Sequence, residues 1–174
     1  SAASDVYKRQ DLDVVHICLP HYLHAQVSKY ALDKGLHVFC EKPVDIGYKE
    51  TKDLYDHYMK YKGKQKLGIC FQNRYNNTVV KLKEELEKNK EEVFAVKGLV
   101  TWFRDMAYYK QAPWRGTKKE AGAGVIINQA IHTLDLMAYV TGKDWKSLTA
   151  TLSKLMNKEI EVEDTASAFI CLLY

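Results

Sequence analysis

Three short apolar runs, separated by two amphipathic segments, constrain the fold of this chain more than any other feature. The runs 14–20, 36–40 and 67–71 have the length and residue types of buried strands. Segments 21–34 and 47–61 carry apolar residues at helical spacing. Because strand, helix, strand, helix, strand requires parallel strands joined by right-handed crossovers, residues 11–73 predict the C-terminal half of a Rossmann, doubly wound parallel sheet.

The second apolar run leads directly into the polar step Glu41-Lys42-Pro43. Pro43 donates no ladder hydrogen bond, so it ends the strand, and it disfavours the α region for Lys42. Open α/β sheets bind their ligands at the carboxyl ends of the strands, which is where this lysine stands. A single lysine at a strand end is most often a solvated loop residue, so further motifs must decide its role.

Beyond residue 73 the strict alternation ends, which predicts a second domain, 74–174, of the α+β class with a mostly antiparallel sheet. Its expected elements are a charged helix at 76–91, a long strand at 93–103, a loop-like stretch at 104–122, an apolar helix at 125–140 capped by Gly142, and strands at 145–156 and 165–173.

Composition excludes several classes of protein. An apolar share of 47% and a charged share of 28% are typical of an ordinary globular protein. The 26 basic residues are interspersed with 22 acidic ones rather than clustered with aromatic residues, so we expect no nucleic-acid partner. No run is long enough to span a membrane. The cysteines lack zinc-type spacing and lie in apolar runs, which predicts buried reduced thiols, no metal and a cytoplasmic location; they are Cys18, Cys40, Cys70 and Cys171.

Two further segments carry polar groups at positions where chemistry is often found. His21 and His24 follow the first strand at the start of a helix, where main-chain amides attract anions and dinucleotides, although surface histidines are common there. On the apolar helix, Asn128, His132 and Asp135 recur at i, i+4 and i+7. Buried polar groups need partners, so this stripe either faces a wet pocket or joins a hydrogen-bond network.

Taken in order, these motifs resemble the Gfo/Idh/MocA oxidoreductase family over roughly residues 11–170. The resemblance rests on Cys-x-Pro-x-x-x-His after the first strand, Glu-Lys-Pro after the second, Arg74-Tyr75-Asn76 after the third, Trp114-Arg115, and Gly-x-Gly-x-x-x-Asn-Gln-x-x-His-x-x-Asp from residue 122. The Asn-Gln pair before the histidine is similar to the branch that includes nucleotide-sugar 3-dehydrogenases. The inositol-dehydrogenase pattern has Asp where this chain has Asn128.

The resemblance implies an NAD(P)-dependent oxidoreductase that transfers hydride between a nicotinamide cofactor and a hydroxyl or carbonyl of a sugar, nucleotide-sugar or cyclitol. It implies Lys42 and His132 as the catalytic pair and a cis peptide bond between Lys42 and Pro43. Asn128 and Tyr75 are expected to contact the substrate. The residues expected to line the NAD or NADP site are Leu19, Pro20, His21, His24, Glu41, Lys42, Gln72, Asn73, Arg74, Trp114 and Arg115.

No Gly-x-Gly-x-x-Gly phosphate turn occurs in the chain. We therefore expect a fragment that lacks the first half of the dinucleotide-binding domain, is truncated at its C-terminus, and is inactive by itself. Residues 1–10 show no periodicity and are expected to be a non-native or disordered leader. The complete protein is expected to form dimers or tetramers through the second domain.

Two alternatives from other functional classes remain at this point. One is a glycosidase of the same family that uses NAD transiently and consumes none. The other is a non-catalytic binding homologue, against which the presence of both Lys42 and His132 argues, because a binding module needs neither.

Overall fold

A computed structural model of the chain describes residues 12–89, 93 and 95–172. Its internal contacts divide the chain into two compact units, Ser1–Cys70 and Phe71–Tyr174, which we treat separately. The leader expected at residues 1–10 lies outside the described residues. Within the described part of the chain, no helix combines the length and apolar character needed to cross a membrane.

The first unit contains the predicted parallel sheet. Strands β1 (Val14–Ile17), β2 (His37–Glu41) and β3 (Leu67–Cys70) lie in the order β1-β2-β3, and both pairings are parallel. Ile17 is paired with Cys40, and Glu41 is paired with Cys70. The carboxyl ends of all three strands therefore meet at one edge of the sheet.

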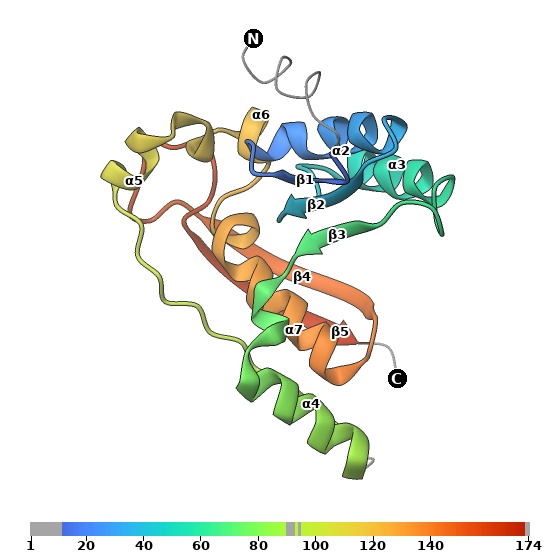
Figure 1. Ribbon diagram of the computed structural model, residues 1–174. Helices are drawn as coiled ribbons and strands as arrows, with labels where there is room; N and C mark the ends of the chain where they lie inside the picture. Colours follow the sequence, from blue (N-terminus) through green and yellow to red (C-terminus); the bar gives the residue numbers. More distant parts are fainter. Residues whose placement is uncertain (1–11, 90–92, 94, 173–174) are drawn as a thin grey trace. The chain divides into compact units, whose positions relative to one another are not determined.

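One face of this sheet is covered by helices (Figure 1). A short 3₁₀ turn, η1 (His21–Leu23), leads into α2 (His24–Asp33), and α3 (Tyr48–Met59) follows β2. The chain reverses after α2 at Gly35. This residue has a φ of +82°, in the left-handed region that favours glycine. The helices and strands enclose a single apolar core built from Val15, Ile17, Ala25, Ala31, Leu32, Val38, Cys40 and Leu54.

The period-2 alternation of the strands explains which side chains the helices leave uncovered. Val15 and Ile17 are buried, whereas Val14, which precedes Val15 and faces the other side of the sheet, is 56% exposed, and Phe39 of β2 is 41% exposed. The expectation of four buried cysteines was wrong: Cys40 is buried, but Cys18 and Cys171 are exposed. Burial raises the pKa of the Cys40 thiol to about 12, so this thiol stays protonated and serves as an apolar core group.

The second unit begins with the turn η2 (Gln72–Tyr75) and the charged helix α4 (Asn77–Asn89). The stretch 104–122, expected to be loop-like, instead contains three short helical elements, α5 (Met106–Gln111), η3 (Pro113–Gly116) and α6 (Lys118–Ala121). They are too short to show a full apolar period, which is why the pattern did not reveal them. The apolar helix follows as η4 (Ile126–Ala130) and α7 (Ile131–Thr141), and the antiparallel pair β4 (Trp145–Ser153) and β5 (Thr165–Leu172) completes the unit.

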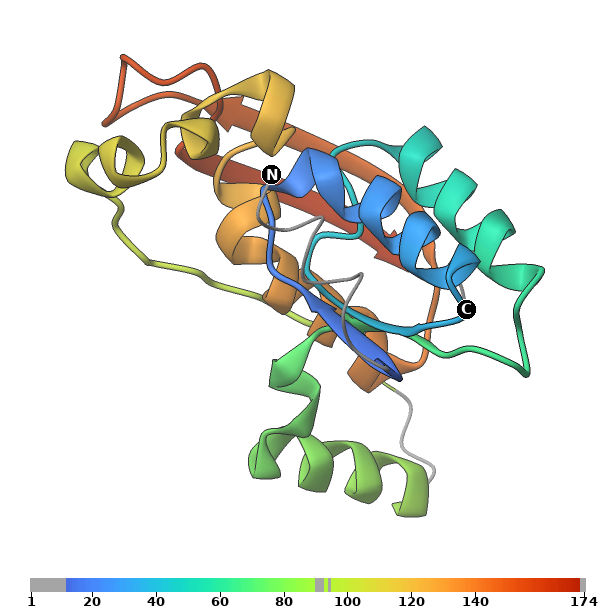
Figure 2. The same cartoon turned by 45° about the horizontal axis from the view of Figure 1, so that its top comes forward.

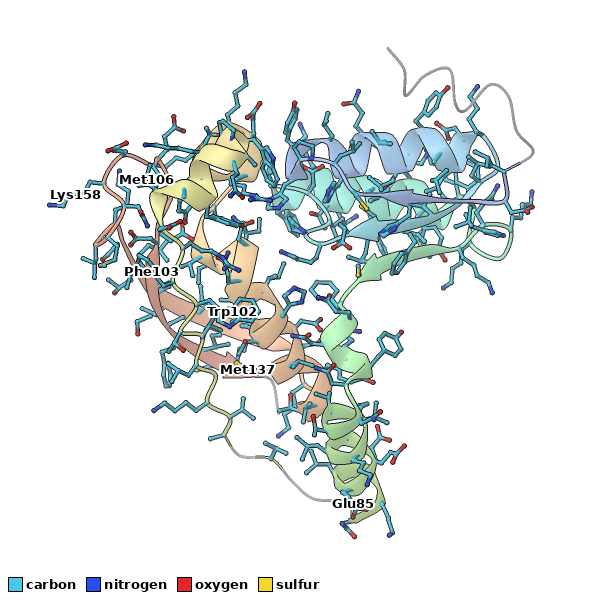
Figure 3. All side chains as sticks on the ribbon, turned by 60° about the vertical axis from the view of Figure 1, so that its left-hand side comes forward. Glu85, Trp102, Phe103, Met106, Met137 and Lys158 are labelled. Carbon is cyan, nitrogen blue, oxygen red and sulfur yellow. The ribbon has the colours of Figure 1, made fainter. Side chains whose placement is uncertain are left out.

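The predicted strand at 93–103 was wrong in part. Its described residues are extended, but none is hydrogen-bonded as a strand, and they run as a coil between α4 and α5 (Figure 2). With helix η4–α7 and strand β5 they enclose a groove of about 840 Å³. Trp102, Phe103 and Met137, labelled in Figure 3, line this groove, and the first two are more than half exposed.

Helix η4–α7 starts at a contact with Glu163, which lies 37 residues after Ile126 in the sequence. The amide of Val125 donates to the carbonyl of Glu163 (3.0 Å), and the amide of Ile126 donates to the carboxylate of the same residue (3.1 Å). The carbonyl of Glu163 lies so close to Gly124 that a methyl group there would overlap it. Gly124 is therefore required by close packing.

The loop between β4 and β5 is organised by the carboxylate of Asp164. It accepts hydrogen bonds from the amides of Leu155 (2.9 Å), Met156 (2.9 Å) and Asn157 (2.6 Å), and from the hydroxyl of Thr165 (3.0 Å). Partial burial raises the pKa of Asp164, but these hydrogen bonds outweigh it, so the pKa lies below the ordinary value of 3.8.

Gly124→Ala is expected to lower the free energy of unfolding by roughly 1–3 kcal/mol, since the new methyl group must displace the backbone at Glu163. Chemical denaturation of the chain measures the change. Gly47→Ala is the control, because its methyl group would meet only the mobile end of the Glu50 side chain. An unchanged midpoint for Gly124→Ala would contradict the assignment.

Asp164→Asn is expected to cost roughly 1–2 kcal/mol at neutral pH, through loss of charge-assisted hydrogen bonds that are partly exposed to solvent. Because the pKa of Asp164 is lowered in the folded state, this stabilisation is present above about pH 4 and is lost as the pH falls further. Denaturation midpoints of the two proteins should thus converge on acidification. Asp144→Asn, which alters an exposed residue just before β4, is the control and should leave the midpoint at neutral pH unchanged.

Candidate active site

In the first unit, Lys42 stands on the turn that leaves β2 at the carboxyl edge of the sheet. Its side chain is partly exposed, while Pro43 beside it is buried. The Lys42–Pro43 peptide bond is cis, as predicted. The lysine is thus held at a strand end by a buried proline, at the edge where parallel sheets bind ligands.

The turn after β1 lies next to the turn after β2. Leu19 is 39% exposed, whereas His21 and His24 are 4% and 1% exposed. His24 places its Nδ1 atom 2.6 Å from the carbonyl oxygen of Pro43 and its Nε2 atom 2.7 Å from that of Leu19. The buried imidazole of His24 therefore connects the two turns. Direct contact of His21 or His24 with a cofactor stays a prediction.

Glu41, the last residue of β2, lies beside exposed groups of β1. Its carboxylate is 3.7 Å from the Nε2 atom of His16, and the ligand atoms of His16, Cys18 and Glu41 lie within 4.8 Å of one another. These are residue types that hold zinc, but exposed groups of this kind are common without a metal. We interpret His16 and Glu41 as a partly exposed pair at the sheet edge.

In the second unit, His132 lies in the first turn of α7 and is 7% exposed. The ring of Phe71 meets it edge to face, with centroids 6.2 Å apart. A histidine held in this way has few accessible orientations, which suits a group that must transfer a proton in one direction.

Asp135, one turn after His132, is bound by Arg74. The guanidinium donates from Nε (2.8 Å) and from Nη2 to the two carboxylate oxygens, and it lies over the rings of Tyr139 (4.8 Å) and Phe71 (5.4 Å). The hydrogen bonds to Asp135 raise the pKa of Arg74, so the guanidinium stays positively charged. Arg74 was predicted to line the cofactor site; in this unit it joins η2 to α7, and its contact with a cofactor stays a prediction.

The stripe of Asn128, His132 and Asp135 was predicted from uniform α-helical spacing. Residues Ile126–Ala130 instead form a π-helical segment, so Asn128 belongs to a wider turn than His132. Such segments are often found at functional sites, where they redirect side chains. The amide of Asn128 donates to the carbonyl of Gly124 (3.0 Å), at the constrained start of the helix.

The remaining predicted residues of this unit differ in exposure. Tyr75 is 82% exposed and Gln72 is exposed, whereas Asn73 is partly buried. Trp114 and Arg115 lie on η3 and are partly buried, and the guanidinium of Arg115 is 4.4 Å from the ring centre of Tyr108. Their roles toward cofactor or substrate stay predictions.

Two buried acids, one in each unit, were not foreseen. Asp45, 5% exposed, accepts hydrogen bonds from the amides of Ala25 (3.0 Å) and Ile46 (2.7 Å), and so joins the turn after β2 to the start of α2. Glu163 holds the start of η4. A local signal existed for Asp45, which lies two residues after Pro43 of the Glu-Lys-Pro motif, but none existed for Glu163, whose partners lie far away in the sequence.

Two family models match the chain. Residues 1–68 match the oxidoreductase family with an NAD-binding Rossmann fold, and residues 81–172 match the GFO/IDH/MocA C-terminal domain. The second match alone covers more than half of the chain.

Individual proteins similar to this chain are also oxidoreductases. Levoglucosan dehydrogenase of Pseudarthrobacter phenanthrenivorans is 30% identical over 82% of the chain, and inositol 2-dehydrogenase of Rhizobium meliloti is 26% identical over 86%. The solved structure of the WlbA dehydrogenase from Bordetella pertussis, in complex with NADH and UDP-GlcNAcA, is 28% identical over 96% of the chain with a TM-score of 0.86.

The chain spans only part of each relative: 36% of the levoglucosan dehydrogenase, 43% of the inositol dehydrogenase and 51% of the WlbA chain. Both of its units nevertheless match, and the parallel sheet followed by an antiparallel pair agrees with the predicted fold class. The chain belongs to the Gfo/Idh/MocA family of oxidoreductases.

Proposed function

We propose that this chain is part of an NAD(P)-dependent oxidoreductase that acts on a hydroxyl or carbonyl group of a sugar, nucleotide-sugar or cyclitol. The observation that carries the proposal is the position of Lys42, on a turn at the shared carboxyl edge of three parallel strands, in a chain of an oxidoreductase family. Family membership supplies the reaction class, and the sheet edge supplies a place for the chemistry.

The residues at this edge fit one half of a dinucleotide site. Leu19 offers an exposed apolar surface on the turn after β1, and Lys42 offers a cation on the turn after β2. A nicotinamide cofactor, when bound, supplies the hydride acceptor or donor. We assign the nicotinamide end to this edge because the chain carries no glycine-rich phosphate turn.

Within this proposal His132 is the acid–base group and Lys42 its electrostatic partner. A neutral imidazole accepts the proton of a sugar hydroxyl near neutral pH, and the ammonium of Lys42 stabilises the developing negative charge on the oxygen. Asn128 and Tyr75 are assigned to orienting the substrate. The joint action of Lys42 and His132 rests on the family resemblance.

The names of the relatives support the substrate class. They include a levoglucosan dehydrogenase, an inositol 2-dehydrogenase and a WlbA dehydrogenase in complex with a nucleotide-sugar. The Asn128-Gln129 pair favours a nucleotide-sugar for this chain. No feature of the residues that the structure describes favours the glycosidase or the binding-only alternative.

The organisation of the whole protein is part of the proposal. We assign residues 11–73 to a partial dinucleotide-binding domain and residues 74–174 to a domain for substrate binding and oligomerisation. The protein is proposed to act in the cytoplasm as a homodimer or homotetramer, without a nucleic-acid partner.

Lys42→Ala in the complete protein is expected to lower kcat by roughly 10²–10⁴-fold, because the charge that stabilises the alkoxide is lost. Reduction of NAD and NADP is followed with a panel of sugars, cyclitols and nucleotide-sugars. Lys49→Ala, which removes an exposed lysine of α3, is the control and should retain turnover. Near-normal turnover of Lys42→Ala would refute the catalytic assignment.

The 174-residue chain alone is expected to bind NADH only weakly, since half of the dinucleotide site is absent from it. Fluorescence titration and calorimetry measure the affinity directly. Binding with a Kd on the order of micromolar would show that the 174-residue chain holds a sufficient dinucleotide site, against the assignment of residues 11–73 to a partial domain.

A further inference from the structure

The ring of His24 is bound between two groups that can only accept hydrogen bonds. Its Nδ1 atom faces the carbonyl of Pro43 at 2.6 Å, and its Nε2 atom faces the carbonyl of Leu19 at 2.7 Å. A neutral imidazole carries one N–H and one lone pair, so one of these contacts would set a lone pair against a carbonyl oxygen. Only the imidazolium donates at both positions.

The surroundings are suited to a buried cation. His24 is 1% exposed, so water does not solvate its charge. Both carbonyl dipoles point their negative ends at the ring, at the short distances typical of charge-assisted hydrogen bonds. The buried carboxylate of Asp45 binds the amide of Ala25, the residue that follows His24. A buried charge is tolerated where such partners compensate for lost hydration.

His37 provides the opposite case in the same unit. Its Nδ1 atom accepts a hydrogen bond from the amide of Lys66 (2.9 Å), so that nitrogen must carry a lone pair. The two histidines therefore have contrasting hydrogen-bonding requirements, although both belong to the first unit.

We propose that His24 is a positioning residue whose two ring nitrogens both donate hydrogen bonds, one to each turn, so that the ring ties the turn after β1 to the turn after β2 and thereby holds Lys42 in place. Leu19 follows the end of β1 by two residues, and Pro43 follows the end of β2 by two residues. Their carbonyls are the acceptors, so the ring sets the spacing between the two turns. The positioning role rests on the proposed function, whereas the two hydrogen bonds donated by the ring do not.

The protonation state is tested by nitrogen NMR of the histidine rings in the ¹⁵N-labelled 174-residue chain at about pH 7.5, where an exposed histidine is mostly neutral. We expect both ring nitrogens of His24 to show attached protons. His37 is the internal control and should show one protonated and one unprotonated nitrogen. An unprotonated nitrogen in the His24 ring would overturn the proposal.

The positioning role is tested with His24→Gln in the complete protein. Glutamine donates from one nitrogen only, so it cannot span both carbonyls. We expect kcat to fall roughly 10–100-fold while the KM for the sugar changes little, because the reacting group is misplaced and the substrate pocket is kept. His57→Gln, which alters a histidine bonded to Asp33 on the helical side of the unit, should leave kcat unchanged.

The outcomes separate the two proposals. Wild-type kcat in folded His24→Gln would overturn the positioning role, whatever the ring shows. Full turnover of Lys42→Ala would instead overturn the proposed function, and two protonated ring nitrogens would then identify His24 as a structural cation only.

Discussion

The parallel pairing of β2 with both β1 and β3 is the constraint on which the rest of the first unit depends. Because the register aligns Ile17 with Cys40 and Glu41 with Cys70, the strands end together and their turns become neighbours. The apolar core beneath, which includes Leu32 and Leu54, sets the distance of the helices from the sheet. Only with the turns adjacent can one imidazole ring reach a carbonyl of each.

The second unit depends instead on polar contacts between distant segments. Glu163 holds the start of the helix that carries His132, and Arg74 holds Asp135 one turn further on. The helix is thus fixed at two points, with a π-helical segment between the first of them and the histidine. The face of this helix that carries Leu134 and Met137 borders the apolar groove beside residues 95–103. The helix therefore has apolar neighbours along the groove and polar partners at Glu163 and Arg74.

Errors of prediction in this chain concern exposure and pairing more than element type. Tyr55, in the amphipathic segment that forms α3, is 55% exposed, and Leu82, in the charged helix α4, is 50% exposed. Helical periodicity shows that apolar residues share a face, but it does not show how much of that face a neighbouring element covers. Residues 95–103 have strand-like composition without a strand partner, because β propensity depends on pairing that a local pattern does not contain.

The sequence by itself determined the parallel sheet, the strand ends, Lys42 and His132 as candidate groups, and the family, because periodicity, proline and ordered motifs are local properties. The tertiary structure alone decided what lies against each candidate. Contacts between Glu163 and Val125, between Arg74 and Asp135, and between His24 and Pro43 join residues 19 to 61 positions apart. Such contacts exist only once strand register and helix packing have brought distant segments together, so no local pattern encodes them.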